Sequence, residues 1–198
     1  MEWFSDPRWA HIVWALGLAA WWGIRLPRRR AAKRSKVIKD KVTVGERVAL
    51  SFNITALALV PAIGLATDWL DFADYPFVPV LAVLGALALI AFLALFYLSH
   101  KQLGKNWSVT LEVRENHSFV RRGLYARMRH PMYTSFWLWG ISQALLLNNW
   151  IYGPIGLLSI AWLYFSRVSN EEAMMREQFG EEYDAYCAVT PRVVPRIF

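Results

Sequence analysis

The chain contains a single cysteine, Cys187, so it cannot form an intrachain disulfide, and its cysteine content does not indicate a redox compartment. Histidine is also scarce, and the four histidines lack the close spacing of zinc ligands, so we expect no metal site. The sequence has no internal repeat and no G-x-G-x-x-G motif. Too little soluble chain lies between its apolar segments to build a Rossmann domain. A nucleotide-like ligand would therefore have to bind in another way.

Charged residues are few and lie in blocks. They make up 19% of the chain, against 56% hydrophobic residues, and the chain has 11 tryptophans. Apolar runs separated by charged loops are typical of a polytopic membrane protein. The net charge of +7 comes from lysines and arginines that flank the apolar runs. We interpret this charge as a signal for orientation in the membrane, and we expect no nucleic-acid partner.

Five apolar segments are candidates for membrane-spanning helices, since about 20 apolar residues cross the hydrocarbon core. They cover residues 9–26, 48–66, 77–98, 131–147 and 150–165. The last two are short, and the Asn148-Asn149 pair between them is a turn signal that predicts a tight helical hairpin. The sequence therefore predicts an all-α integral membrane bundle with about five transmembrane helices. Three of them lie in residues 1–99, whereas residues 100–198 hold a polar loop, the hairpin and a C-terminal tail.

The C-terminal tail is polar and predicts two further helices. Residues 171–179 have an amphipathic pattern, and Gly180 is expected to end or kink that helix. Residues 181–187 form a second short helix with Tyr183 and Tyr186 on one face. Two later prolines favour extended chain beyond it.

The loops differ in charge. Residues 25–41 contain nine lysines and arginines with one acid, residues 100–129 contain seven with two glutamates, and residues 67–75 contain three aspartates and no base. The positive-inside rule then places the two basic loops and the C-terminal tail in the cytoplasm, with the N-terminus outside. Because the N-terminus carries Glu2 and Asp6 instead of a basic region, we expect the first apolar segment to be retained rather than cleaved as a signal peptide.

A cation, an imidazole and a phenol occur within five residues at the start of the fourth segment, in the sequence Arg129-His130-Pro131-Met132-Tyr133. Proline suits the first turn of a helix, where its missing N–H would have no partner. We therefore expect a helix to begin at or beside Pro131. Polar side chains at such a position can face a water-soluble ligand while the helix behind them lies in lipid.

A second polar group, Arg167 with Glu171 and Glu172, follows the fifth apolar segment. Arg167 and Glu171 are four residues apart, so they share a helix face at the membrane boundary and favour a salt bridge. Glu172 and Arg176 are spaced for another. Ionisable groups near membrane depth are costly and tend to line functional cavities. We interpret the two polar groups as one site.

Six motifs follow one another in the second half of the chain. They are His117-Ser-Phe-Val120, Gly123-Leu-Tyr125, residues 129–133, Arg167-x3-Glu171-Glu172, Phe179-Gly180-Glu-Glu-Tyr183-x2-Tyr186 and Pro195. This ordered set resembles the isoprenylcysteine carboxyl methyltransferase family and its phospholipid methyltransferase relatives. The resemblance covers residues 100–198 and implies an all-helical integral membrane enzyme that uses S-adenosylmethionine without a Rossmann fold. The helical tail would then form part of the cofactor site on the cytoplasmic side.

Carried over position by position, the resemblance implies which residues form the site. The S-adenosylmethionine contacts would be His117, Ser118, Phe119, Val120, Tyr125, His130, Pro131, Met132, Tyr133 and Glu171. Arg167 matches the arginine that the family places near the substrate, and with Glu171 it is the expected catalytic pair. Leu124 and Ser135 depart from the family pattern, which often has Pro or Val at the first position and glycine at the second. Neither change removes a group that takes part in the chemistry. The side chain of Ser135 can, however, take up space where glycine would let two helices pack closely.

The residue types suit methyl transfer to a lipid-linked acceptor. Transfer from a sulfonium is one in-line displacement, so the enzyme mainly positions donor and acceptor. A carboxylate, such as that of a prenylated cysteine, is ionised at neutral pH and needs no base, and Arg167 can hold it through two hydrogen bonds. An amine or alcohol would need a base such as Glu171, Glu172 or His130. A lipid-linked acceptor would enter sideways from the membrane lipids.

Three other functions stay open on the sequence alone. Membrane sterol and enone reductases share a similar tail but bind NADPH, and Arg121, Arg122 and Arg127 offer cations for its 2′-phosphate. A phospholipid amine N-methyltransferase is implied by the same resemblance. A scaffold or small transporter is disfavoured, because the polar residues cluster on one side rather than at mid-membrane, where transport sites lie. No feature of the sequence indicates an oligomeric state.

Overall fold

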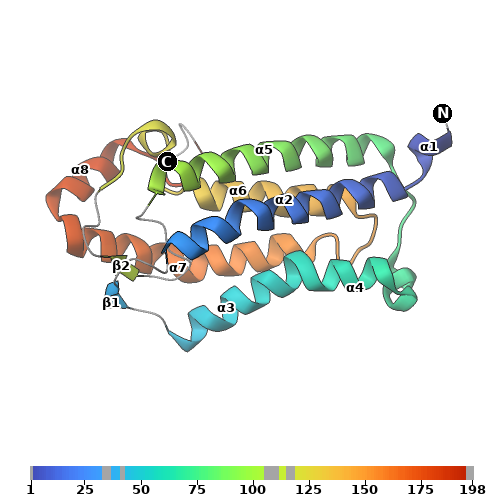
Figure 1. Cartoon of the computed structure of the whole chain (residues 1–198), viewed down its shortest axis with the longest axis horizontal. Coiled ribbons are helices and arrows are strands. Elements are labelled where there is room, and N and C mark those ends of the chain that lie inside the picture. The colour runs from blue at the N-terminus through green and yellow to red at the C-terminus, as the bar shows by residue number, and fades with distance from the viewer. Residues whose placement is uncertain (1, 33–36, 41–42, 105–111, 115–118, 195–198) are drawn as a thin grey trace.

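The computed structural model of the protein describes residues 2–32, 37–40, 43–104, 112–114 and 119–194. Long helices run along its length and form the bundle seen in Figure 1. They are α2 (Arg8–Ala32), the run of α3 (Val44–Ile54), π-helical η1 (Thr55–Leu59) and α4 (Val60–Ala66), then α5 (Pro79–Leu103), α6 (Pro131–Leu146) and α7 (Ile155–Phe179). Shorter elements are α1 (Glu2–Ser5), the 3-10 helices η2 (Asp68–Ala73) and η4 (Gly123–Ala126), α8 (Glu181–Val189), and the strands β1 (Val37–Asp40) and β2 (Glu112–Arg114).

The expectation of an all-α chain needs one correction. The strands β1 and β2 pair in antiparallel orientation, with Val37 opposite Arg114 and Asp40 opposite Glu112. They belong to the two basic loops that the charge pattern places on the same side of the membrane. Pairing between the loops satisfies backbone groups that would otherwise depend on water, so a short sheet is added to a helical bundle.

Two helical runs among the described residues are long and apolar enough to cross a membrane, namely Val44–Ala66 and Pro79–Leu103. The hairpin helices differ from these two for visible reasons. Helix α6 has only 16 residues. Helix α7 has 25 residues, but its second half is polar. The helix expected at 171–179 is therefore not separate; it continues α7 without a break, and Gly180, at φ +53°, separates it from α8 as expected.

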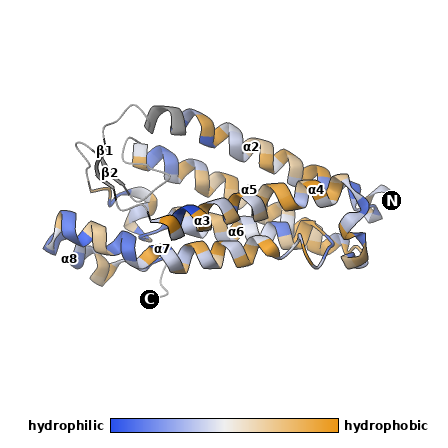
Figure 2. Ribbon diagram, turned by 90° about the horizontal axis from the view of Figure 1, so that it is seen from below, coloured by the Kyte–Doolittle hydropathy of each residue, from blue (hydrophilic) through white to orange (hydrophobic). Residues whose placement is uncertain are grey.

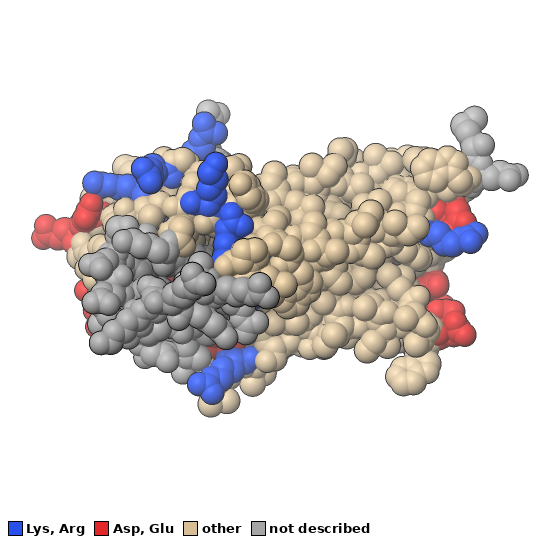
Figure 3. Space-filling model, viewed as in Figure 1, with Lys and Arg blue, Asp and Glu red and all other residues tan. Residues whose placement is uncertain are grey.

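Charged side chains gather at the two ends of the bundle. In Figure 3, lysines and arginines lie mainly at the end that carries α8, and acidic residues also mark the opposite end, where η2 lies. The surface between these ends carries no charge on the face shown in Figure 3, and Figure 2 shows the helices that run between the ends as largely hydrophobic. The exposed apolar side chains of α5 include Leu84, Leu87 and Ile90. A belt of exposed apolar surface between charged ends fits a bilayer. We name the α8 end the basic end and the η2 end the acidic end.

Aromatic and amide side chains hold the centre of the bundle together. Trp139 of α6 packs against Phe92 of α5, with ring centroids 4.8 Å apart. The Trp139 indole donates to Gln143 Oε1, and Gln143 Nε2 donates to the carbonyl oxygens of Ala56 and Tyr152. Inside a bilayer such groups have no water to bind, so they must find partners within the protein. Gln143 therefore ties η1 to the hairpin.

The hairpin predicted from the asparagine pair is present, and Asn149 builds its turn. The Asn149 side-chain oxygen accepts from the backbone N–H groups of Ile151 and Tyr152. Its amide donates to the Leu70 carbonyl and to the Asp74 carboxylate. Because Asn149 is fully buried, these bonds join the turn to the acidic connection at the acidic end.

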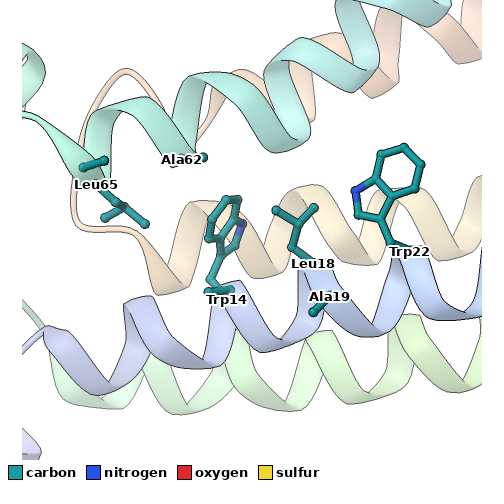
Figure 4. Close-up of a pocket in the computed structure, with 8 residues that line it drawn as sticks. Trp14, Leu18, Ala19, Trp22, Ala62 and Leu65 are labelled. Atoms are coloured by element: carbon teal, nitrogen blue, oxygen red, sulfur yellow. The ribbon is translucent and has the colours of Figure 1, made fainter.

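An open apolar groove of about 440 Å³ lies between α2 and α4 (Figure 4). It is lined by Trp14, Ala15, Leu18, Ala19, Trp22, Ala62, Leu65 and Ala66. None of the residues predicted for the polar site lines this groove, so that site has to be sought elsewhere.

Candidate functional site

Helix α6 begins at Pro131, as predicted, and His130 is its N-cap residue. No side chain caps the helix start. The two preceding backbone N–H groups are instead held by the C-terminal segment: Arg129 donates to the Pro191 carbonyl and His130 to the Arg192 carbonyl, both at 2.8 Å. The segment after α8 is thereby fastened across the start of α6.

Glu172 is the centre of an ionic cluster at this helix start. Its carboxylate lies 3.1 Å from His130 Nε2 and 3.2 Å from Arg129 Nη1. Arg192 binds it with two hydrogen bonds, from Nε at 3.1 Å and from Nη2 at 2.9 Å. Burial alone would raise the pKa of Glu172, but the bonds from His130 and Arg192 and the charge of Arg129 outweigh it and hold the pKa at about 2. Glu172 is therefore an anion at every physiological pH.

Its neighbour Glu171 has a different environment. The Tyr133 hydroxyl donates to Glu171 Oε2 at 2.9 Å, and His130 Nδ1 lies 3.9 Å from Glu171 Oε1. The imidazole of His130 thus lies between two carboxylates. The Glu171 side chain keeps 33% of its surface exposed, whereas that of Glu172 keeps 1%. Glu171 is accordingly the carboxylate that a ligand can reach.

The Gly123–Ala126 turn is held in place from two sides. Gly123 has φ +65°, and a Cβ there would lie 2.6 Å from the Gln102 side chain, so only glycine fits. The Gln102 oxygen accepts from the Leu124 backbone N–H at 2.8 Å. On the other side, the Tyr186 hydroxyl donates to the Tyr125 carbonyl at 2.6 Å. Tyr125 is buried, which raises the pKa of its phenol.

Aromatic rings lie beside this turn. Phe119 stacks on Phe179, with centroids 5.1 Å apart, and contacts Tyr183 and Tyr186 of α8. Arg121 lies over the Phe119 ring and pairs with an acid of α8. The face of α8 predicted from the tyrosine spacing is therefore the face that receives the loop.

The predicted partner of Arg167 is wrong. Arg167 Nη2 lies 3.4 Å from Glu46 Oε1 of α3, rather than against Glu171 four residues along its own helix. Arg176 likewise bonds to Asp184 of α8 at 2.9 Å and not to Glu172. The helix spacing allowed the local pairs, but tertiary packing gives Arg167 a buried partner from another helix, whereas the pair of Arg176 with Asp184 is exposed.

The structure brings together only part of the predicted set. His130, Tyr133 and Glu171 form one cluster, and Phe119 and Tyr125 lie in the adjoining aromatic layer. Pro131 is buried and begins α6. Val120 is half-buried, and so is Met132, which packs against the hydrophobic core. His117 and Ser118 lie outside the described residues.

The structure adds two charged residues, Arg192 and Glu46, that the sequence-based site did not include. Arg129 and Glu172 belonged to the two polar groups, but neither was assigned a contact with the cofactor. No sequence pattern indicated a role for Arg192, because it lies in a segment without regular secondary structure. A lone acid at the start of the apolar run Val44–Ala66 was the signal for Glu46. Among the described residues, no group of three His, Cys, Asp or Glu side chains is arranged to hold a metal ion.

These features define a helical membrane bundle with a polar site at its basic end. Comparison with known proteins then shows which family the chain resembles. The model of the isoprenylcysteine carboxyl methyltransferase (ICMT) family matches residues 83–177. This segment contains every described residue of the predicted site, so the resemblance inferred from the motifs is confirmed.

Similar proteins carry the name protein-S-isoprenylcysteine O-methyltransferase. The one from Schizosaccharomyces pombe is 33% identical over 99 residues, which cover 48% of this chain and 42% of that protein. The human protein is 36% identical over 93 residues, which cover 46% of this chain and 32% of that protein. The chain thus matches less than half the length of these relatives.

A solved structure shows the same fold. It is described as the eukaryotic intramembrane Ras methyltransferase ICMT, and it aligns with a TM-score of 0.52 and 23% sequence identity over 81% of this chain and 55% of that one. The structural match extends well beyond residues 83–177. Helices before residue 83 therefore take part in the shared fold, although the family model does not match them.

Proposed function

We propose that this chain is an integral membrane methyltransferase that transfers a methyl group from S-adenosylmethionine to a lipid-linked acceptor, with a carboxylate such as that of a prenylated cysteine as the favoured acceptor. One observation carries the proposal. The segment that matches the ICMT family places His130, Tyr133 and Glu171 in one cluster at the basic end, and Arg167 lies one helical turn before Glu171 on α7.

The described residues fit S-adenosylmethionine in three respects. Nε of Arg129 is buried and has no hydrogen-bond partner among the described residues, so it can bind a carboxylate. The exposed part of Glu171 can accept from ribose hydroxyls or an amino group. The rings around Phe119 offer an aromatic surface for adenine. When bound, this cofactor supplies an electrophilic methyl group on a positively charged sulfur.

The protein's own part is mainly placement. Tyr133 and Glu171 hold each other by a hydrogen bond, and His130 is fixed between Glu171 and Glu172. An acceptor carboxylate needs no proton removed, so Arg167 has only to orient it and neutralise part of its charge. An amine acceptor would need a base, and then His130, next to two carboxylates, would be the group to accept the proton.

We also propose that the chain crosses the membrane five times, with the N-terminus outside and the C-terminus and the site in the cytoplasm. Residues 1–99 would supply three crossings, and residues 100–198 the catalytic region. The charge distribution in Figure 3 supports this orientation, because the basic end carries the loops rich in lysine and arginine. Single cysteines at Asp71 and Lys36, in a Cys187→Ser background, should be labelled from opposite sides of sealed vesicles. Labelling of both from one side would refute the five-crossing arrangement.

Two measurements test the activity. The purified protein in nanodiscs should be stabilised against heat by S-adenosylmethionine and S-adenosylhomocysteine, since ligands that bind only the folded state raise its stability. NADPH should have no effect, and stabilisation by NADPH alone would favour the reductase.

Labelled S-adenosylmethionine should then transfer its methyl group to farnesylcysteine. The methyl ester of farnesylcysteine is the matched control, because it has the same lipid chain and no free carboxylate. Transfer to phosphatidylethanolamine in place of farnesylcysteine would show an amine acceptor.

A further inference from the structure

Glu46 occupies an unusual position for an acidic residue. It lies in the first turn of α3, where its backbone N–H donates to the Thr43 hydroxyl at 3.1 Å. In a Thr-x-x-Glu capping box the glutamate side chain would reach back to the N-cap backbone. Here the carboxylate instead lies against Arg167 of α7, at 3.4 Å. The side chains of Glu46 and Arg167 keep only 4% and 10% of their surface exposed.

The contact is part of a fixed register between α3 and α7. Seven residues after Glu46, on the same face of α3, the Asn53 amide donates to the Ser159 hydroxyl of α7 at 3.2 Å. Three residues further, the Ala56 carbonyl accepts from Gln143 of α6. All three polar contacts are buried, and together they prevent α3 from sliding along the hairpin. One buried partner of the Arg167 guanidinium therefore comes from a helix outside the segment that matches the family, residues 83–177.

We infer that Glu46 is a positioning residue that holds the guanidinium of Arg167 in the orientation needed to receive the methyl acceptor. The inference rests on the proposed function, in which Arg167 binds that acceptor. Arginine presents its N–H donors in a planar fork, and a buried carboxylate beside the fork helps to fix its direction. Loss of the Glu46 charge would shift the guanidinium, and a small misplacement of a reacting group costs about 100-fold in rate.

The test compares three variants of the full-length protein in nanodiscs. Glu46→Gln keeps the shape and removes the charge, Glu46→Asp keeps the charge and shortens the reach, and Asn53→Ala removes another α3–α7 contact without touching Arg167. For each variant, kcat and KM for farnesylcysteine are measured beside the affinity for S-adenosylmethionine. Glu46→Gln should lower kcat about 10- to 100-fold while the cofactor affinity changes by less than about twofold, since Glu46 is assigned no contact with the cofactor.

The other two variants separate positioning from general loosening of the bundle. Glu46→Asp should recover part of the lost turnover, because an aspartate can still pair with Arg167, and it keeps the test usable if Glu46→Gln does not fold. Asn53→Ala should keep turnover within about threefold of the wild type, since surrounding contacts remain. Normal turnover in Glu46→Gln, equal losses in Glu46→Gln and Asn53→Ala, or a parallel loss of cofactor affinity would each overturn the inference. Absence of methyl transfer in the wild-type protein would instead refute the proposed function itself.

Discussion

At the acidic end, Asn149 makes four hydrogen bonds, three of them to backbone groups, and no part of it remains exposed. At the basic end, the described partners of the Glu172 carboxylate are all side chains, namely those of His130, Arg129 and Arg192. Both residues are buried and fully used. The two residues differ in their surroundings. The hydrogen bonds of Asn149 stay within the turn and the neighbouring acidic connection, whereas the Glu172 cluster adjoins Glu171, whose carboxylate is partly exposed.

This comparison shows which end is built to bind a ligand. A polar side chain that saturates the backbone of a turn shapes the turn and has no capacity left. A network of polar and ionised side chains that ends at a partly exposed carboxylate has capacity for a further polar molecule. The buried Nε of Arg129, which has no hydrogen-bond partner in the described part of the chain, adds to that capacity. Each prediction below perturbs one side of this contrast.

The largest effect is expected from Glu172→Gln, which leaves two arginines and an imidazole around a neutral amide. The pKa of Glu172 is held at about 2, below its ordinary value of 4.5. That shift corresponds to roughly 3 kcal/mol of stability at neutral pH.

The sign of the pH dependence follows from this shift. The stabilisation is complete above pH 4.5 and is lost as the pH falls toward 2, because the unfolded chain then binds a proton that the folded chain resists. Thermal unfolding in detergent between pH 7 and pH 3 should show the gap between the wild type and the variant narrowing below pH 4.5. If the stability difference between the wild type and the variant widens on acidification, the stabilising role of the ionised Glu172 would be wrong.

Arg167→Lys should affect activity rather than folding. Lysine keeps the charge beside Glu46 but cannot bind a carboxylate through two parallel hydrogen bonds. We expect turnover to fall by about 100-fold, or about 3 kcal/mol in the barrier, with S-adenosylmethionine affinity unchanged. Parallel loss of cofactor affinity, measured by calorimetry, would place Arg167 with the cofactor instead.

Asn149→Ala is the matched change at the acidic end. It removes the bonds to Ile151, Tyr152, Leu70 and Asp74, and should lower stability by about 2 kcal/mol because buried backbone groups lose their partner. Cofactor affinity and the KM for the acceptor should stay as in the wild type. If the cofactor affinity or the KM changes by more, expressed as free energy, than the free energy of unfolding, the two ends are coupled. The distinction drawn between them would then be wrong.

The smallest effect is expected from Tyr133→Phe. The change removes one hydrogen bond to Glu171 and leaves the ring packed against Tyr164, at 5.3 Å between centroids. Cofactor affinity should fall by about 1 kcal/mol, or about fivefold, and stability should hardly change. The double variant with Glu171→Gln should show less than additive losses, since both changes break the same bond.

The sequence determined the features that depend on neighbours along the chain. The start of α6 at Pro131, the hairpin turn at Asn149, the break at Gly180 and the tyrosine face of α8 were all predicted correctly. Each follows from a local rule: proline and glycine restrict or free the backbone, asparagine binds its own turn, and helix periodicity sets a face. The motifs also pointed to the family whose model matches residues 83–177.

Only the tertiary structure decided which charges meet. Arg167 pairs with Glu46, 121 positions earlier in the chain, and Glu172 binds Arg192, 20 residues later in an irregular segment. The pairing of β1 with β2 also joins loops that are distant in sequence, with Asp40 opposite Glu112 and Val37 opposite Arg114. Spacing along a helix identifies the possible partners of a charge on its own helix. A buried charge pairs with whichever group the packing places beside it, because the free-energy cost of a buried unpaired charge exceeds the stabilisation from a local pair.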